Sequence, residues 1–338
     1  MRRPPAGGKP GGKRIDSRRP RCCDGRRSPV IGAGPGRNPH VSTTAPGIDA
    51  ELAGRLIAAQ FPRWARLPLT LLDPAGSDHV IFRLGETMTV RLPRGDWAAG
   101  QAVKEHAWLP LIGPLLPVAV PVPLGLGVPD LGYPWHWSVT RWLDGVTATP
   151  DGFADDEATA RRLAGFLARL QRIAPAETLL PGPHPELADA PLVGRDEATR
   201  AAIAAVGGDF DAVALTEVWD RALKAPAWDR EPVWFHGDLH TGNLLAVDGR
   251  LSAVIDFGGL GMGDPACDLV IAWTLMTAGP RSVFRAELDI DDGAWERGRG
   301  WALATGLNAY TAYAATHPRV AAQTRRQIEA VLADHTGR

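Results

Sequence analysis

The apolar positions of the chain follow two different periods, one in each half. Near the start of the patterned region, apolar residues recur at helical spacing over residues 48–61, with Leu52, Leu56 and Ile57 on one face and Pro62 ending the run. The β-prone segments that follow lie at 67–72, 80–84, 87–92, 118–121 and 135–142. We expect one helix among them, at 98–109, and an irregular connection beyond it because five prolines interrupt residues 109–126.

The pattern becomes helical after Asp144-Gly145. Segment 157–172 carries Leu163, Phe166 and Leu167 on one face, and further helices are expected at 267–277, 295–316 and 318–334. Residues 175–210 show little regular pattern, which predicts an extended insertion. The chain is therefore expected to form an α+β fold with a small β-rich N-terminal lobe (46–143) and a larger, mainly helical C-terminal lobe (144–338).

Residues 1–45 differ from the rest of the chain in composition. They are rich in Gly, Pro and Arg and lack a hydrophobic period, so we expect them to be disordered. They contain 11 Arg or Lys and two Asp, which leaves the remaining residues with a net negative charge. We expect an inert extension here rather than a nucleic-acid-binding tail, and an acidic, solvated surface elsewhere, with an acidic cleft that attracts a cationic substrate as the alternative.

Composition indicates an ordinary globular enzyme. Hydrophobic residues make up 45% of the chain and charged residues 22%, and no segment approaches the roughly 20 unbroken apolar residues of a membrane helix. Three cysteines, with Cys22 and Cys23 adjacent, provide no disulfide framework, and the basic N-terminus lacks the apolar core of a secretory signal. We expect a cytoplasmic location and no membrane partner.

The residues with the clearest chemistry lie in two neighbouring segments. The first is His236-Gly237-Asp238-Leu239-His240-Thr241-Gly242-Asn243, and the second is Ile255-Asp256-Phe257-Gly258. A turn at Asp248-Gly249 would pair strands 244–247 and 251–255, which brings Asn243 and Asp256 together beside Asp238. Two oxygen ligands and a free carboxylate suit magnesium-assisted phosphoryl transfer to a hydroxyl group.

These segments, with Gly263-Asp264-Pro265-Ala266-Cys267-Asp268-Leu269, resemble the aminoglycoside phosphotransferase family of kinase-like enzymes. The resemblance implies a protein-kinase-like two-lobed fold, ATP or GTP as co-substrate, Mg²⁺ and a small-molecule acceptor. It implies that Asp238 is the catalytic base and that Asn243 and Asp256 are the metal ligands. The residues expected to support the loop are His236, His240, Asp264 and Asp268.

The resemblance extends to the N-terminal half with one departure. Arg91 stands where the family more often has lysine to hold the nucleotide phosphates, and Glu105 is its expected partner. Ser77, in the turn 75–79, is an expected phosphate contact. The end of strand 135–142 resembles the family's hinge, where main-chain groups near Arg141 and Leu143 would contact adenine.

Several alternatives remain open at this stage. The acceptor is an aminoglycoside-like antibiotic or, alternatively, a metabolic amino alcohol or sugar derivative, and a catalytically silent nucleotide-binding module is the rival from another class. His236 and His240 around Asp238 also resemble a metal-hydrolase cluster, but the sequence offers no second group of His or Cys to complete a zinc site. The oligomeric state is not predicted. Asp289, Asp291 and Asp292 are expected in a solvated loop, and the residues expected in the core are Trp273, Trp295, Trp301 and Tyr310.

Overall fold

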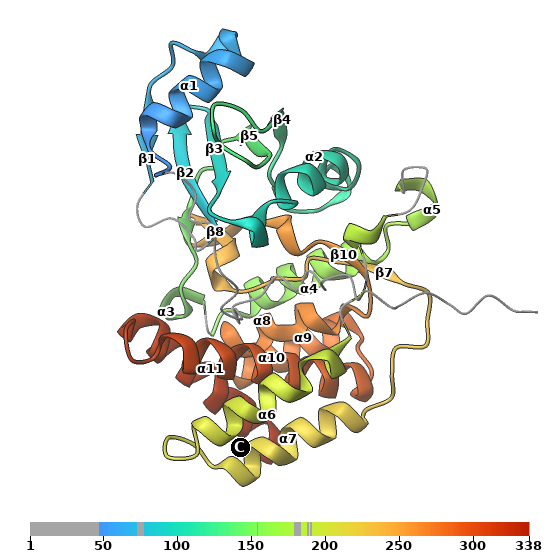
Figure 1. Cartoon of the computed structure of the whole chain (residues 1–338). Coiled ribbons are helices and arrows are strands. Elements are labelled where there is room, and N and C mark those ends of the chain that lie inside the picture. Colours follow the sequence, from blue (N-terminus) through green and yellow to red (C-terminus); the bar gives the residue numbers. More distant parts are fainter. Residues whose placement is uncertain are drawn as a thin grey trace, which may run out of the picture. The chain divides into compact units, whose positions relative to one another are not determined.

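The computed structural model describes residues 47–72, 78–153, 155–178, 184–187, 189 and 191–337. The expectations for residues 1–45 and for Ser77 lie outside the described residues. Within them, a β-sheet occupies the amino-terminal part and helices dominate the carboxyl-terminal part (Figure 1), which confirms the α+β prediction. None of the described helices is both long and apolar enough to cross a membrane.

A five-stranded antiparallel sheet forms the amino-terminal part. Its strands are β1 (Leu69–Leu71), β2 (His79–Leu84), β3 (Met88–Pro93), β4 (Pro123–Gly127) and β5 (Trp137–Arg141), in the order β1-β2-β3-β5-β4. Helix α1 (Ala50–Gln60) contacts β1, and α2 (Gln101–Ile112) contacts β4 and β5. Asp49 caps α1 by accepting a hydrogen bond from the Leu52 amide at 2.8 Å. Phe82, Val90 and Trp137 are fully buried in the core of this part.

Two sequence predictions fail around α2. The helix predicted at 98–109 begins at Gln101 and continues through Pro110 to Ile112. Burial of Trp108, Leu109 and Ile112 stabilises this last turn and offsets the backbone hydrogen bond that a proline cannot donate. The strand predicted at 118–121 is reduced to a single bridge between Ala119 and Ala253, and β4 begins only at Pro123.

A second, smaller sheet lies in the carboxyl-terminal part. Strands β8 (Leu244–Val247) and β9 (Arg250–Val254) form the hairpin predicted around Asp248-Gly249, and β6 (Val146–Thr147) pairs with β8. Asp248 and Gly249 both have positive φ, as the tight turn requires. Strand β7 (Val233–Phe235) pairs with β10 (Gly261–Gly263), and the loop that carries Asp238 begins directly after β7.

The helices of this part surround one apolar core. They are α3 (Pro150–Phe153), α4 (Glu157–Gln171), α5 (Pro175–Thr178), α6 (Asp196–Ala205), α7 (Ala212–Lys224), α8 (Ile271–Thr274), α9 (Ala278–Leu288), α10 (Asp292–Tyr313) and α11 (Pro318–Thr336). The core includes all four predicted aromatic residues, Trp273, Trp295, Trp301 and Tyr310.

Two predictions for this part need correction. The extended insertion predicted at 175–210 contains α5 and α6, and α7 and α9 were not predicted. The helix predicted at 267–277 is instead the 3-10 helix η8 (Pro265–Val270) followed by the short α8. Asp289, Asp291 and Asp292 are exposed, as predicted, in the connection between α9 and α10 and at the first residue of α10. Asp291 also caps α10 by accepting a hydrogen bond from the Ala294 amide.

Candidate active site

The loop that carries Asp238 makes a close backbone contact with a second loop. Gly237 has a φ of +83°, and a Cβ atom there would lie 2.1 Å from the carbonyl oxygen of Gly259. Only glycine accommodates both the left-handed backbone and this contact. The loop after β7 therefore packs directly on the 3-10 helix η7 (Phe257–Gly259), which follows Asp256.

Asp268 fixes the start of the loop. Its carboxylate is fully buried and accepts hydrogen bonds from the amides of His236 (2.7 Å) and Gly237 (2.8 Å). Burial raises the pKa of Asp268, while the two amide hydrogen bonds act in the opposite direction. Asp264 begins the same 3-10 helix by accepting from the Ala266 amide (3.1 Å), and its carboxylate pairs with Arg297 of α10 at 2.6 Å.

His236 connects the loop to the neighbouring hairpin. Its Nδ1 accepts a hydrogen bond from the Asp238 amide (3.2 Å), so the ring proton lies on Nε2, which donates to the Ile255 carbonyl (3.1 Å). The ring is fully buried against Phe257. His236 thus contacts the residue before Asp256 and the backbone of Asp238.

Asp238 keeps a partly exposed carboxylate, with 32% of the side chain accessible. The Asn243 side-chain amide donates to the Asp238 carbonyl (2.8 Å) and to its Oδ2 (3.3 Å). His240 Nε2 lies 3.7 Å from the same Oδ2, while His240 Nδ1 accepts from the Gly242 amide (3.0 Å). Although burial acts to lower it, the pKa of His240 is raised by the Asp238 carboxylate.

Asp256 lies at the open end of the hairpin in a left-handed conformation, with a φ of 64°. The hairpin brings it near Asn243, because the Ile255 amide donates to the Asn243 carbonyl at 2.9 Å. Arg91 Nη2 donates to Asp256 Oδ1 at 2.9 Å, and 31% of the Asp256 side chain is exposed. Burial acts to raise the pKa of Asp256, but Arg91 and other nearby charges lower it to about 2, so the carboxylate is ionised.

Arg91 and Glu105 form the pair that the sequence led us to expect. Arg91 Nη1 contacts both carboxylate oxygens of Glu105, at 2.8 and 2.6 Å, and both residues are buried. Glu105 Oε1 also accepts from the Phe257 amide (2.9 Å), so α2 is bonded directly to η7. Burial alone would lower the pKa of Arg91, but Glu105 and Asp256 raise it, and the guanidinium remains charged.

Two residues of this region had no signal in the sequence. Lys104 donates from Nζ to the carbonyls of Gly258 and Leu260, both at 3.0 Å, and burial lowers its pKa to about 8. His79, at the start of β2, is buried, and burial together with the charge of Arg91 lowers its pKa to about 3. Both depend on contacts between segments far apart in sequence, which local patterns do not reveal.

The expected adenine contacts lie at the end of β5. The Arg141 side chain is exposed, and its amide donates to the Val122 carbonyl at 2.9 Å. Leu143 is the second residue beyond the strand. The structure therefore brings Arg91, Glu105 and Asp256 together, and places Arg141 at the end of β5 and Leu143 on the segment between β5 and β6.

The oxygen atoms of Asn243 and Asp256 fit a magnesium ion. The Asn243 amide nitrogen is directed at Asp238, and no described residue donates to its Oδ1. The Asp256 carboxylate is ionised and uses only Oδ1 for Arg91. Two hard oxygen donors, one of them on a partly exposed carboxylate, are what Mg²⁺ takes from a protein when phosphates and water supply the rest. Among the described residues, no group of three or more His, Cys, Asp or Glu side chains is arranged to hold a metal.

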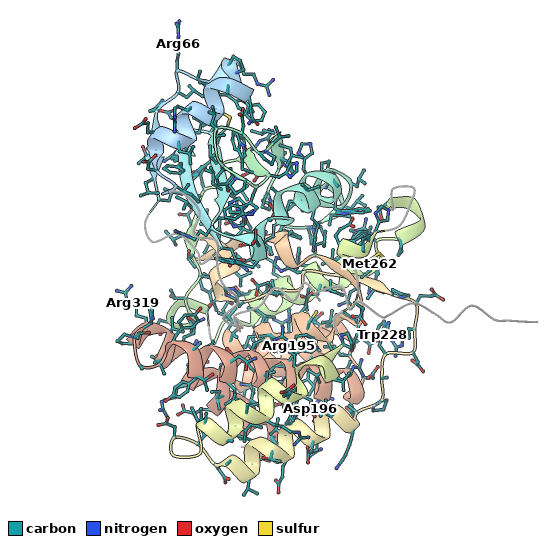
Figure 2. The ribbon with its side chains drawn as sticks, in the orientation of Figure 1. Arg66, Arg195, Asp196, Trp228, Met262 and Arg319 are labelled. Carbon is teal, nitrogen blue, oxygen red and sulfur yellow. The ribbon has the colours of Figure 1, made fainter. Side chains whose placement is uncertain are left out.

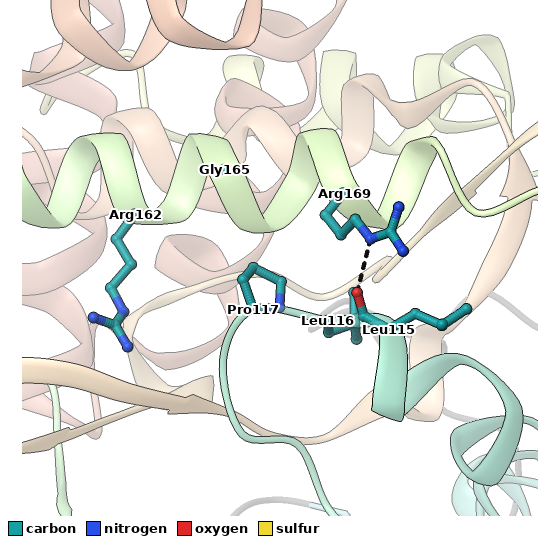
Figure 3. Close-up of a pocket in the computed structure, with 6 residues that line it drawn as sticks. All are labelled: Leu115, Leu116, Pro117, Arg162, Gly165 and Arg169. Atoms are coloured by element: carbon teal, nitrogen blue, oxygen red, sulfur yellow. Dashed lines mark hydrogen bonds between the residues drawn. The ribbon is translucent and has the colours of Figure 1, made fainter.

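A surface pocket lies elsewhere and includes none of these residues. It is lined by Leu115, Leu116, Pro117, Arg162, Gly165 and Arg169. Figure 3 shows Arg169 of α4 donating through Nε to the Leu115 carbonyl, at 2.8 Å. We assign no role to this pocket.

Comparisons with known proteins give a family and a fold. A model of the phosphotransferase enzyme family matches residues 70–301, which is more than half of the chain. No curated protein sequence matches. Similar solved structures include the GDP complex of a mutant of aminoglycoside 2'-phosphotransferase-IIIa, with a TM-score of 0.65 and 20% identity, covering 86% of this chain and 99% of that one.

Two other structures are similar over comparable lengths. Macrolide 2'-phosphotransferase MphH from Brachybacterium faecium has a TM-score of 0.54 and 21% identity, covering 80% of this chain and 98% of that one. A streptomycin–ATP ternary complex of APH(2")-IIa has a TM-score of 0.51 and 15% identity, covering 84% and 99%. At these identities the likeness establishes the kinase-like fold and leaves the acceptor open.

Proposed function

The chain belongs to the phosphotransferase enzyme family, and from that premise we propose that it transfers the γ-phosphoryl group of ATP to a hydroxyl of a small molecule. The observation that supports this most is the convergence of three groups on one loop pair. Asp238 bears an accessible carboxylate, Asn243 and Asp256 offer oxygen ligands, and the Arg91–Glu105 pair lies against Asp256. Each of these is a part that phosphoryl transfer requires.

The proposed reaction assigns one task to each residue. The hydroxyl oxygen of the acceptor bonds to the γ-phosphorus while the hydroxyl proton passes to the Asp238 carboxylate. The bond between the γ-phosphorus and the β-phosphate oxygen breaks, and ADP leaves. Asn243 holds Asp238 through its amide and, with Asp256, would bind Mg²⁺, which when bound neutralises phosphate charge. Arg91 would contact the nucleotide phosphates, Ser77 would add a phosphate contact, and main-chain groups near Arg141 and Leu143 would bind the base.

GTP is the alternative to ATP. Related structures hold GDP, ADP or ATP, so both nucleotides belong in the first assay. The proposal places the reaction in the cytoplasm, where ATP and Mg²⁺ are both abundant.

The relatives determine the first acceptors to test. Similar structures include complexes with kanamycin, gentamicin and streptomycin, and macrolide phosphotransferases. Purified protein with ATP, Mg²⁺ and a panel of these antibiotics, amino alcohols and sugar derivatives should release ADP with at least one acceptor. Loss of that activity on removal of Mg²⁺ is expected, and a complete absence of phosphorylated product across the panel would count against the proposal.

One observation favours a second candidate, a catalytically silent nucleotide-binding module. The Arg91 guanidinium already bonds Asp256, the proposed metal ligand, at 2.9 Å. An arginine reaches further than lysine and keeps a fixed planar geometry, so this ion pair competes with magnesium. A silent module would bind nucleotide with no acceptor turnover, and Arg91→Lys would not restore any.

A further inference from the structure

Arg195 is a cation held in a fixed position close to the proposed catalytic loop. It ends the 3-10 helix η5 (Leu192–Arg195) and directly precedes α6. The residue is half-buried, and its guanidinium carbon lies 4.6 Å from the ring centroid of Trp301, which is itself buried on α10. Figure 2 shows it among the helices of the carboxyl-terminal part. Stacking on an aromatic ring fixes the plane of the guanidinium and leaves its N–H groups free at the edges.

No described carboxylate forms an ion pair with Arg195. Its neighbour Asp196 is directed elsewhere, since Asp196 Oδ1 accepts from Arg200 Nε and from Trp219 Nε1, both at 2.7 Å. The buried arginines of the same part are paired. Arg297 bonds Asp264, and Arg299 bonds Asp334. A half-buried cation without a counterion carries a desolvation cost, which a bound anion would offset.

Arg195 and the 3-10 helix η8 both pack on the first half of α10. Arg195 stacks on Trp301, and Arg297, about one turn earlier, bonds Asp264 at the start of η8. Asp268 of η8 in turn binds the Gly237 amide, directly before Asp238. Burial lowers the pKa of Arg195, and the neighbouring groups that oppose this effect are Cys267 and Asp238. The charge of Asp238 thus acts on the guanidinium, which agrees with this packing. The carboxylates close to Cys267 are engaged elsewhere: Asp264 by Arg297, Asp268 by backbone amides, and Asp189 by a partner of its own.

We propose that Arg195 binds an anionic group of the acceptor, a carboxylate or a phosphate, and so orients the acceptor hydroxyl toward Asp238. The inference rests on the proposed function, and it narrows the acceptor class. A planar guanidinium presents two parallel N–H donors to an oxyacid group and holds it in one orientation. It repels an ammonium group placed at the same point, so a polyamine antibiotic is disfavoured as the acceptor.

Paired ligands test this directly by calorimetric titration of the full chain with Mg-ADP present. The pairs are glycerate against glycerol, glycerol 3-phosphate against glycerol, and gluconate against sorbitol, with kanamycin as the polycation. At least one anionic ligand should bind about tenfold more tightly than its neutral twin, since a charged hydrogen bond contributes more than 1.4 kcal/mol. The glycerate and glycerol 3-phosphate arms separate a carboxylate from a phosphate preference.

Two variants assign any preference to Arg195. Arg195→Gln should abolish the difference between anionic and neutral twins, and Arg195→Lys should keep part of it. Arg319→Gln removes an exposed arginine at the start of α11 (Figure 2) and should leave the difference unchanged. The inference is overturned if no anionic ligand binds more tightly than its twin, or if the preference survives in Arg195→Gln. A merely structural Arg195 would change the melting temperature but not the ratio between twins.

The outcomes for the reaction and for this site can be distinguished. If kanamycin or another uncharged or cationic acceptor is phosphorylated in an Asp238-dependent way and Arg195→Gln has no effect, the proposed function stands and this inference fails. If the anion preference depends on Arg195 but no acceptor is ever phosphorylated, the anion site stands and the proposed function fails.

Discussion

Single buried side chains determine the position of the loop that carries Asp238. Asp268 uses both carboxylate oxygens on the amides of His236 and Gly237, and His236 in turn accepts from the Asp238 amide. Each of these partners is a backbone group, so the loop is held by its main chain while the Asp238 side chain stays accessible. A charged acceptor of two amides is worth more than a neutral one, and its loss leaves buried donors unsatisfied.

The variant Asp268→Asn tests this arrangement. An asparagine has one acceptor oxygen, so its amide nitrogen would face one of the two backbone N–H groups. We expect a loss of about 1–3 kcal/mol in the free energy of unfolding and a fall in kcat, with nucleotide affinity unchanged. Urea unfolding measures the free energy of unfolding, and initial-rate kinetics measure kcat and the KM for the nucleotide. The exposed Asp220→Asn is the control, and a variant of Asp268 with normal kcat would contradict this role.

Gly237→Ala tests the backbone contact. The substitution places a Cβ atom 2.1 Å from the Gly259 carbonyl oxygen at a residue with a φ of +83°. We expect a loss of at least about 2 kcal/mol in stability, since the left-handed conformation alone costs about 1–2 kcal/mol. Gly165→Ala, in the middle of α4 with open space at its Cβ, should instead stabilise by about 0.5–1 kcal/mol. Equal melting temperatures for Gly237→Ala and wild type would show that the two loops can separate freely.

At the scale of elements, α2 connects the sheet with the loop after Asp256. Glu105 bonds Arg91 of β3 and the Phe257 amide, and Lys104 bonds the carbonyls on either side of Gly259. The two adjacent residues thus bond the Arg91 side chain and the backbone of a segment more than 150 residues away. A shift of α2 would move Asp256 and Arg91 together.

Glu105→Gln tests the role of α2. Removing the charge leaves the buried Arg91 paired only with Asp256, and we expect a loss of about 3 kcal/mol in stability together with a higher KM for ATP. Glu157→Gln on α4 is the matched control, because its exposed pair with Arg161 contributes at most about 0.5 kcal/mol. Similar stability losses for the two variants would mean that the Glu105 network is not important for the fold.

Sequence patterns predicted the elements whose signals are local. The β8–β9 hairpin followed from its Asp248-Gly249 turn, and the hairpin in turn predicted that Asn243 and Asp256 come together beside Asp238. Helix α7 also had a local signal, which the sequence prediction missed: Asp211 caps it, and its buried residues Leu215, Val218 and Trp219 recur at helical spacing. In contrast, the Arg91–Asp256 pair joins residues 165 positions apart, and no pattern along the chain encodes that contact.

At the scale of the whole molecule, the described chain contains two separate apolar cores. One lies within the sheet and α1, and the other lies among the helices that follow. Between the two cores, hydrogen bonds of Arg91, Lys104 and Glu105 connect β3 and α2 with the segment that begins at Asp256. His79, in β2, is buried, and the charge of Arg91 on the neighbouring strand β3 acts on it. Protonation of His79 therefore affects the stability of the folded state.

The pKa of His79 predicts a pH dependence. Burial lowers it from 6.5 to about 3, so between these values the unfolded chain binds a proton that the folded chain does not. Stability should therefore be fully present above pH 6.5 and fall as the pH decreases, by up to about 1.4 kcal/mol per pH unit from this group. The free energies of unfolding of wild type and His79→Gln at pH 7, 6 and 5 measure this contribution. The difference in free energy of unfolding between the two proteins should shrink on acidification, whereas the exposed His106→Gln should follow wild type. A constant difference would contradict the prediction.

The account depends most on Asp238, and one measurement addresses it directly. Wild type and Asp238→Ala are compared for Mg²⁺- and ATP-dependent phosphorylation of the best acceptor, with nucleotide affinity determined in the same preparations. Removing a general base costs about 10²–10⁴ in rate, so we predict a loss of that size with the nucleotide Kd changed less than twofold. Turnover by Asp238→Ala at the wild-type rate would contradict the account.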